Sequence, residues 1–532
     1  KKKKNIFETL TDIVFKKKEE NIQPTNIQQT YDFSNQQSQP NNQTTNKDHP
    51  NEIGYAGGNN KKYTNKFYNL QKSKYKVCGY VTDVEGNMDY FNKYVKISKI
   101  LEWTCEKKNR LKFKKNDSIF IYGGDTQDRG DSDIRFVNIL LKFKEDYPER
   151  VIFIIGNRDA NKLRIPSEIS EKYSNYQNFL KKYDNYPYWE DKSVRITLRK
   201  YLKDNNYDLN IKNRLKYIVE RTMGNKDGFE KRRVELSIIL KKNINNISDN
   251  DVISSFLNSV LPKPKNITQS NDNYMLKYLM QGQLVHIFGE HIFVHGAINE
   301  KNIGKIPKNK NTIEDIHIWA KEINNWFHKE LKEYMKNPKD GGITKKRKAH
   351  NIINYAVPGY NKDITIVYAD NLKNGNGVHI NKNVIEHLNK YGIKNIITGH
   401  KPHGDCPLVI RDKNLTAISA DTSYSNINYL KNIKDDKYYN DKRGKAVSEV
   451  LLYSNGDIRV HGILADNSKY GYIIKKNKKS PSSSDYIGLQ LNNNYWVKNF
   501  KNNKYLISFG KGFDIDEKWV NLQELKKLLK KL

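Results

Sequence analysis

Five short stretches of the sequence each place an aspartate, asparagine or histidine directly after an apolar run. In chain order they are "TDVEGN" (82–87), "GGDTQDRG" (123–130), "GNRD" (156–159), "VHGA" (294–297) and "GHKPHGD" (399–405). Taken singly, each stretch is weak evidence for a functional site, because Gly-Asp and Gly-Asn pairs are common in turns. Five in order are hard to explain as turns alone. Carboxylate, amide and imidazole groups are ligands for divalent metal ions in proteins, so the set predicts metal chemistry.

The apolar runs before these stretches predict the strands that would position them. "YKVCGYVTD" (75–83), "SIFIYGGD" (118–125) and "RVIFIIGN" (150–157) are typical of buried strands. "MDYFNKYVKISKILEW" (88–103) and "DIRFVNILLKFKEDYP" (133–148) have helical periodicity. The alternation predicts βαβ units with parallel pairing, which bring strand ends to the sheet edge where α/β proteins place their sites. Further strands are predicted at "QLVHIFGEHIFVHGAI" (283–298, a hairpin turning at Gly289), "DITIVYAD" (363–370), "IKNIITGH" (393–400), "LTAISAD" (415–421) and "VSEVLLYSNGDIRVHGI" (447–463, a hairpin).

Composition divides the chain into segments. Residues 1–74 are basic and rich in Asn and Gln, with too few aliphatic side chains to offset the entropy of ordering, so we expect a largely disordered segment. A basic stretch, "KKRKAH", favours a solvated loop over a nuclear-localisation or nucleic-acid patch. The remaining segments expected are the first half of the core (75–165), a helical insertion that would cap the site (166–280), the second half of the core (281–475) with a basic insert at about 301–355, a linker (476–485) and a small C-terminal element of a strand pair and a Lys-rich helix (486–532).

The charge and the targeting signals bear on partners and compartment. The formal net charge of +34 would suit an anionic partner such as nucleic acid, although Lys and Asn are enriched along the whole chain, as a codon bias would produce. No apolar run is long enough to span a membrane, and the polar start "KKKKNIFETL" is unlike a signal peptide. The three cysteines give no disulfide framework. We therefore expect an intracellular protein of the cytoplasm or nucleus, or of the virion if the chain comes from a large DNA virus, and not a secreted one.

The order and spacing of the five stretches resemble the calcineurin-like metallophosphoesterases, and within them the branch of phosphoprotein phosphatases and diadenosine tetraphosphatases. That branch carries DxHG, GDxxDRG, GNH followed by Glu or Asp, HGG and GH, and "GGDTQDRG" is the most specific match. The resemblance covers about 75–465 with the inserts excluded. It implies an α/β sandwich of two mixed sheets flanked by helices, with helical insertions. It also implies a hydrolase that cleaves phosphate esters or anhydrides by attack of a hydroxide bridging two divalent metal ions.

The resemblance assigns seven candidate ligands, which are Asp83, Glu85, Asp125, Asn157, His295, His400 and His403. Asp83 would hold the first ion and Asp125 would bridge the two, while the asparagine and the first two histidines would hold the second. Glu85 stands where the family has a histidine, and its oxygen favours Mn²⁺ as the first ion, with Mg²⁺, Fe and Zn as alternatives. For His403 two interpretations are open: a ligand of the first ion, or a residue of the pocket wall.

Three further residues are implied in catalysis. Arg129 matches the phosphate-holding arginine of the family, and Asp128 would orient its neighbours. Arg158 stands where the family has a histidine that protonates the leaving group, and a guanidinium cannot do that. We expect Arg158 to stabilise negative charge on the phosphoryl group, together with Arg129.

Two functions are the main alternatives for these residues, beside a phosphodiesterase that acts on nucleotides or nucleic acid. The first is an active hydrolase whose substrate is a phosphorylated protein, a nucleotide or a dinucleoside polyphosphate. The second is a catalytically weak or inactive phosphatase-fold protein that binds nucleic acid or forms part of a particle; the replacements at Glu85 and Arg158 and the basic charge favour it. Other enzyme classes lack their motifs, since the sequence has no P-loop, no Rossmann GxGxxG, no HExxH and no CxxC pair.

Overall fold

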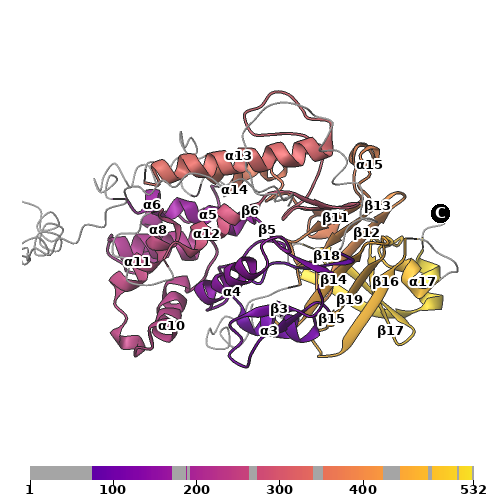
Figure 1. The fold of residues 1–532 in the computed structure, drawn as a ribbon, viewed down its shortest axis with the longest axis horizontal. Coiled ribbons are helices and arrows are strands. Elements are labelled where there is room, and N and C mark those ends of the chain that lie inside the picture. The colour runs from indigo at the N-terminus through magenta and orange to yellow at the C-terminus, as the bar shows by residue number, and fades with distance from the viewer. Residues whose placement is uncertain are drawn as a thin grey trace, which may run out of the picture. The chain divides into compact units, whose positions relative to one another are not determined.

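Two mixed β-sheets lie at the centre of the protein (Figure 1). The computed structural model describes residues 75–170, 187, 192–262, 272–339, 351–422, 444–476, 482–511 and 514–529. The predicted N-terminal segment and "KKRKAH" lie outside these ranges. All of the described residues belong to one unit, Asn60–Leu532.

The first sheet has seven strands in the order β16-β15-β14-β1-β4-β5-β6. One half is parallel and contains β1 (Val77–Val81), β4 (Ser118–Tyr122), β5 (Val151–Ile154) and β6 (Gly282–Gln283). The other half is antiparallel and contains β14 (Val447–Tyr453), β15 (Ile458–Ile463) and β16 (Lys469–Ile474). The sheet is therefore mixed, and its parallel half carries the first three of the five stretches.

The second sheet has five strands in the order β12-β13-β11-β8-β7. Its strands are β7 (His286–Phe288), β8 (His291–Phe293), β11 (Asn395–Thr398), β12 (Leu408–Asp412) and β13 (Leu415–Ser419). Strand β11 runs parallel to both β8 and β13, whereas β7 and β12 are antiparallel edge strands. The last two of the five stretches follow β8 and β11.

The two faces of β1 pack against different parts of the core, because successive side chains of a strand point to opposite sides. Cys78 and Tyr80 join the apolar cluster between the two sheets, where the rings of Tyr80 and Phe293 have centroids 5.7 Å apart. Val77 and Val81 join the cluster on the outer face, under the helices. A fully apolar strand is what a sheet covered on both sides requires.

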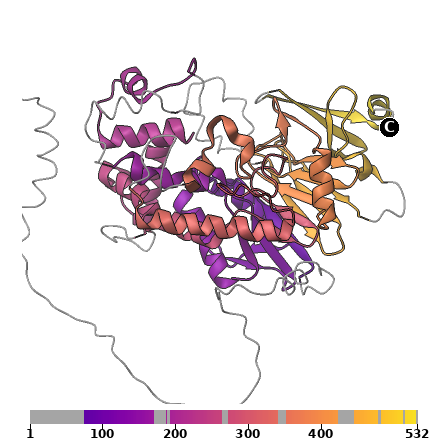
Figure 2. The same ribbon diagram turned by 90° about the horizontal axis from the view of Figure 1, so that it is seen from above.

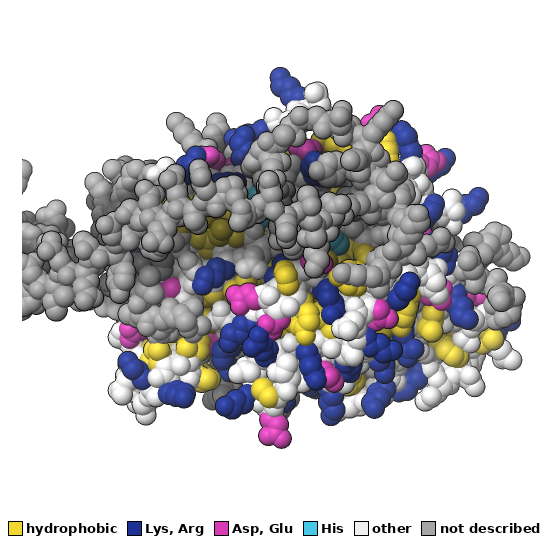
Figure 3. Space-filling model, in the orientation of Figure 1, with side chains coloured by type: hydrophobic (Ala, Val, Ile, Leu, Met, Phe, Trp, Pro, Cys, Tyr) yellow, Lys and Arg dark blue, Asp and Glu magenta, His cyan; other side chains and the backbone are white. Residues whose placement is uncertain are grey.

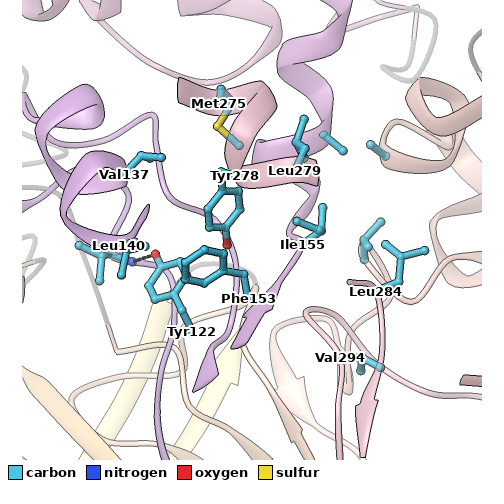
Figure 4. Close-up of a cluster of buried hydrophobic side chains, with 14 of the residues drawn as sticks. Tyr122, Val137, Leu140, Phe153, Ile155, Met275, Tyr278, Leu279, Leu284 and Val294 are labelled. Atoms are coloured by element: carbon cyan, nitrogen blue, oxygen red, sulfur yellow. Dashed lines mark hydrogen bonds between the residues drawn. The ribbon is translucent and has the colours of Figure 1, made fainter. Parts of the chain in front are cut away.

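The outer face of the first sheet is covered by α3 (Met88–Ile97), α4 (Asp133–Asp146) and α12 (Tyr274–Gln281). Figure 4 shows Tyr278 of α12 above Tyr122 and Phe153 of the sheet. The rings of Tyr278 and Phe153 are stacked with centroids 4.9 Å apart, and the Tyr278 hydroxyl donates a hydrogen bond to the carbonyl of Ile154 at 2.9 Å. This packing fixes the end of β5, from which the third stretch emerges.

Between β5 and β6 the described residues form helices and no strands. They are α5 (Asn157–Asn161), α6 (Ile165–Glu168), α8 (Leu198–Asp204), α9 (Ile211–Lys216), a π-helical turn (Tyr217–Thr222), α10 (Gly228–Leu240), α11 (Asp249–Val260) and α12. Figure 2 shows these helices at one end of the sheets and the C-terminal strands at the other. Three further helices, α13 (Ile316–Lys336), α14 (Asn351–Ala356) and α15 (Lys382–Lys390), lie in the second half of the chain. No helix in the described ranges is both long and apolar enough to cross a bilayer.

The C-terminal residues form three strands instead of the predicted pair. They are β17 (Trp496–Lys501), β18 (Lys504–Lys511) and β19 (Asp514–Asn521), followed by α17 (Leu522–Leu528). This sheet packs on the core, because β17 contacts β12 and β16, and the Trp496 indole donates a hydrogen bond to the Gly377 carbonyl at 3.0 Å.

Two predicted elements are wrong. The helix predicted over 88–103 ends at Ile97, and β2 (Leu101–Trp103) pairs with β3 (Leu111–Phe113) in a hairpin. The segment "DITIVYAD" (363–370) is not a strand but a turn, although Ile366 and Val367 are buried. It packs over the fourth stretch, since the Ile366 carbonyl accepts a hydrogen bond from Gly296 N at 2.7 Å. A short apolar run is equally compatible with a strand and a buried loop.

Candidate metal centre

The five stretches meet because each follows a parallel strand at its carboxyl end. Residues 82–87, 123–130 and 156–159 follow β1, β4 and β5, and residues 294–297 and 399–405 follow β8 and β11. Backbone hydrogen bonds join the loops: Asp83 N donates to Gly124 O at 3.0 Å, and Gly399 N donates to His295 O at 2.8 Å. The sandwich therefore brings the loops of both sheets together.

Several candidate residues have a left-handed backbone, which is costly outside glycine. Among the sixteen non-glycine residues with positive φ in the described ranges, five are candidates: Asp83 (φ 52°), Glu85 (51°), Asp125 (55°), Asp128 (102°) and His400 (74°). Such conformations persist only where surrounding contacts hold them, and they gather at functional sites. The left-handed backbone conformations therefore occur at five of the residues that the sequence identified as candidates for metal binding or catalysis.

His295 is held in an orientation that suits a ligand. It is fully buried, and its Nδ1 lies 2.8 Å from the carbonyl of Gly123. Because a carbonyl only accepts, Nδ1 carries the proton, and Nε2 is left to face Asn157 Oδ1 at 3.2 Å and Asp125 Oδ1 at 3.3 Å. Nε2 thus faces two oxygen acceptors, a position that suits either a proton or a metal ion on this nitrogen.

His400 completes the group. The possible ligand atoms of Asp125, His295 and His400 all lie within 4.8 Å of one another. The Nε2 atom of His400 is buried without a hydrogen-bond partner, and its ring packs against those of Tyr368 and His295 at 5.1 and 5.3 Å. Burial lowers the pKa of His400 well below its usual value, so the ring is neutral. An orphaned neutral imidazole nitrogen next to a carboxylate fits a bound divalent ion.

The carboxylates make this pocket strongly negative. Burial lowers the pKa of His295, but the neighbouring Asp125 and Asp83 raise it to about 10 overall. Burial and the charges of Asp125 and Glu85 raise the pKa of Asp83 to about 7. Asp83 Oδ2 accepts hydrogen bonds from Thr82 Oγ1 at 2.5 Å and His400 N at 3.0 Å. A pocket that stabilises positive charge at His295 would equally stabilise a metal ion.

Glu85 and Arg158, the two departures from the family pattern, contact each other. Arg158 Nε lies 2.8 Å from Glu85 Oε1 and 3.4 Å from Asp125 Oδ2. Arg158 Nη1 lies 3.4 Å from Asp128 Oδ2 and donates to the Met223 carbonyl at 3.0 Å. The three carboxylates raise the pKa of Arg158 against its burial, which lowers it. Each departure thus has the other as its ion-pair partner.

Asp128 and Arg129 differ in exposure. Asp128 is fully buried and accepts a hydrogen bond from Lys162 Nζ at 2.6 Å. The Arg129 side chain is 30% exposed, and its Nε lies 3.9 Å from Glu85 Oε1. Arg129 is therefore the candidate cation that reaches furthest toward solvent, next to the pair of Glu85 and Arg158.

His403 is not brought to this group. It is buried against the C-terminal sheet, where its Nδ1 lies 3.4 Å from Ser508 Oγ and its carbonyl accepts a hydrogen bond from Lys498 Nζ. The position favours the second interpretation offered above, a packed residue, over a ligand. At His403, three residues after His400, the chain lies against β18.

Asp159 is a functional candidate that the sequence did not single out as a site residue. Its Oδ2 accepts hydrogen bonds from Asp125 N at 2.9 Å and Gly156 N at 2.8 Å, and its Oδ1 accepts from Thr126 N at 2.8 Å and Thr126 Oγ1 at 2.7 Å. One carboxylate therefore ties the loop after β4 to the loop after β5. Its place as the third residue of α5, where its carboxylate accepts a hydrogen bond from the backbone N–H of Gly156 at the start of the helix, is the sequence signal that could have identified it.

Residues 223–231, between β5 and β6, make three contacts with the candidate catalytic residues. Asn225 Nδ2 donates to Asp128 Oδ1 at 3.4 Å, Lys231 Nζ donates to the Arg129 carbonyl at 3.1 Å, and the Met223 carbonyl holds Arg158. Residues 223–231 thus lie against the candidate catalytic residues, where we expected the insertion to cover or flank the mouth.

Comparison with known proteins agrees with this geometry. The profile of the calcineurin-like phosphoesterases matches residues 78–289, which contain the first three stretches and all of the helices between β5 and β6. Residues 78–289 are thus similar to the calcineurin-like phosphoesterases. The chain is also similar to two solved structures at low identity. A cold-active protein-tyrosine phosphatase of a psychrophilic Shewanella species matches at 13% identity, over 75% of this chain and 80% of that one, with a TM-score of 0.37. A protein serine/threonine phosphatase from Saccharomyces cerevisiae matches at 9% identity, over 78% and 84%, with a TM-score of 0.30.

The family that matches residues 78–289 implies metal ions and a phosphorylated substrate. The side chains fit a metal ion, since Asp125, His295 and His400 converge and the buried Nε2 of His400 lacks a partner. The two mixed sheets with outer helices confirm the predicted fold class.

Proposed function

We propose that this protein is an active, metal-dependent hydrolase of phosphate esters or anhydrides. The convergence of Asp125, His295 and His400 around a buried, unpartnered imidazole nitrogen carries the proposal. A decayed site has no reason to keep three possible ligand groups facing one another, two of them on fully buried residues, because unpaired buried polar groups cost stability. The motif "GGDTQDRG" supports the branch of phosphoprotein phosphatases and diadenosine tetraphosphatases.

The ligand set proposed is Asp125, Asn157, His295 and His400. Two imidazoles, one carboxylate and one amide oxygen suit Mn²⁺, with Fe, Zn and Mg²⁺ as alternatives. When bound, a divalent ion would polarise a phosphoryl oxygen and lower the pKa of a water molecule. The chain's own part is to hold the ligands. Gly123 O fixes the His295 ring, and Asp83 fixes the backbone of His400.

Arg129 is proposed to bind the phosphate. Its partly exposed guanidinium offers paired N–H donors to two phosphate oxygens, as a planar fork does. Arg158 is proposed to add positive charge beside the phosphoryl group from its seat among three carboxylates. Neither guanidinium can protonate a leaving group, because arginine stays charged at every physiological pH.

The lack of an acid at position 158 predicts the substrate class. Substrates whose leaving group needs no proton, such as phosphoanhydrides and aryl phosphates, are expected to be cleaved best. General acid catalysis contributes about 10²–10⁴-fold, so an alkyl ester such as a phosphoserine peptide is expected to lag by about that factor. A nucleotide or dinucleoside polyphosphate thus fits better than a phosphoserine protein.

The test is turnover of an aryl phosphate, a dinucleoside polyphosphate and a phosphoserine peptide by the full chain with added Mn²⁺. Asp125→Asn is expected to abolish turnover of all three. Asp146→Asn is the matched control, because Asp146 pairs with Arg110 on the surface, and it is expected to keep full activity. Fast cleavage of phosphoserine would show that another residue supplies the proton.

A role without catalysis is the second candidate, through nucleic-acid binding. Figure 3 shows Lys and Arg side chains spread over the coloured part of one face with Asp and Glu between them, and no concentrated basic patch there. That distribution favours the hydrolase. Tight binding of Mn²⁺ with no turnover of any substrate in the panel would instead support the binding role.

A further inference from the structure

The pairing of Glu85 with Arg158 changes what the family resemblance implies for the first metal position. That position would be formed by Asp83, Glu85 and Asp125. In the structure, a guanidinium lies against two of these three carboxylates, with Nε 2.8 Å from Glu85 Oε1 and 3.4 Å from Asp125 Oδ2. The guanidinium of Arg158 therefore already supplies a positive charge at this position.

Each oxygen of Asp125 faces a different nitrogen atom. Its Oδ1 faces His295 Nε2 at 3.3 Å, on the side where His400 and Asn157 converge. Its Oδ2 faces Arg158 Nε at 3.4 Å. A carboxylate placed between two metal ions uses its two oxygens in the same way. Here one of the two cations is a guanidinium.

The seat of the guanidinium is built from several sides. Asp128 Oδ2 and the Met223 carbonyl hold Nη1 at 3.4 and 3.0 Å, and the backbone N–H of Arg158 donates to Asp125 Oδ1 at 2.9 Å. The side chain is 17% exposed, and Glu85 is 12% exposed. Met223 belongs to the helical segment between β5 and β6, so this segment also fixes the arginine.

We propose that the guanidinium of Arg158 takes the place of one of the two metal ions, so that the site holds a single divalent ion at Asp125, Asn157, His295 and His400. The inference rests on the proposed metal-dependent function and specifies how many ions serve it. Glu85 is then the anchor of Arg158 and not a metal ligand, and Asp83 positions the backbone of His400.

The decisive experiment is the stoichiometry of Mn²⁺ bound to the full chain. Protein stripped with EDTA is titrated with Mn²⁺ by calorimetry, its metal content is measured by mass spectrometry, and its electron paramagnetic resonance spectrum is recorded. We expect one Mn²⁺ per chain, with the hyperfine pattern of an isolated ion. Two ions per chain, or the spectrum of an exchange-coupled pair, would overturn the inference and leave the hydrolase proposal standing. If the protein binds no Mn²⁺, both the single-ion inference and the proposed metal-dependent hydrolase are refuted.

Variants of Arg158 test whether its guanidinium is what limits the site to one ion. Arg158→Gln frees Glu85 and Asp125, two of the three carboxylates of the first position, and is expected to raise the stoichiometry from one ion to two. The double variant Glu85→His with Arg158→His, which restores the family pattern, is expected to do the same. Arg110→Gln is the matched control, since Arg110 is 59% exposed in its pair with Asp146, and it should stay at one ion. Circular dichroism confirms that each variant is folded. A folded Arg158→Gln protein that still binds one ion would overturn the inference.

Discussion

Gly156→Ala gives a sharp test of how the loops after β4 and β5 are packed. Gly156 has φ −89° and ψ 168°, an extended backbone that alanine adopts without strain. The methyl group, however, would lie 2.1 Å from Asp125 Oδ1 and 2.5 Å from Asp125 N. The substitution therefore acts on Asp125 by steric contact alone.

The size of the effect follows from these distances. A Cβ essentially never lies closer than 3.0 Å to another heavy atom, so the contact with Oδ1 must open by at least 0.9 Å, from 2.1 to 3.0 Å. Metal–ligand distances tolerate only about 0.2 Å. We expect the affinity for Mn²⁺ to fall by at least about 10–100-fold. Overpacking should also lower the free energy of unfolding by about 1–3 kcal/mol.

The affinity is measured by calorimetric titration of EDTA-treated protein, and the stability by urea unfolding. Gly471→Ala is the control, because its methyl group would meet no atom closer than 3.2 Å, the Cβ of His461. It should bind Mn²⁺ like the wild type. If Gly156→Ala binds Mn²⁺ as tightly as Gly471→Ala, then Asp125 is not a ligand and the argument from loop packing is refuted.

Three further predictions concern the ion, the phosphate and the buried charges. Mn²⁺ at about 100 times its dissociation constant should stabilise the fold by about 2.7 kcal/mol, seen as a higher melting temperature that EDTA reverses; no shift would contradict binding to the native state. Arg129→Gln should raise KM for an aryl phosphate by about 10-fold or more and leave the calorimetric affinity for Mn²⁺ unchanged, whereas loss of Mn²⁺ affinity would show a structural role. Lys162→Met should lower the free energy of urea unfolding by about 1–3 kcal/mol, because the fully buried Asp128 loses its shortest hydrogen bond, at 2.6 Å, and keeps Arg158 and Asn225 at 3.4 Å; an effect as small as that of Lys336→Met, at an exposed pair, would contradict this.

The strands that position the site could be predicted from the sequence because each is a buried apolar run that ends in Gly, Asp or Asn. Local patterns of this kind survive in the fold, as at β1, β4 and β5. The segment 363–370 has the same apolar character, yet it is a turn packed over the fourth stretch. Whether this segment forms a strand or a turn depends on its contact with the loop at residues 294–297. The local sequence pattern carries no information about that contact.

The types of the site residues were predictable, but their pairing was not. Spacing after strand ends indicated Asp125, His295 and His400, and the structure brings these three together. His403, three residues further on, faces Ser508, because its neighbourhood is set by a C-terminal sheet that lies about a hundred residues away along the chain. Asp159 makes four hydrogen bonds to two loops, which only the three-dimensional arrangement reveals.

The two replacements at Glu85 and Arg158 argue for a site that has been adjusted and not lost. Taken separately, each looks like damage: one adds a negative charge among carboxylates, and the other removes a proton donor. Together they form an ion pair at 2.8 Å. Independent decay would not place opposite charges in contact at two positions that are only 12% and 17% exposed, since an unpaired charge there is destabilising. The pair therefore leaves both charges compensated next to Asp125, where the proposed ion and phosphate would bind.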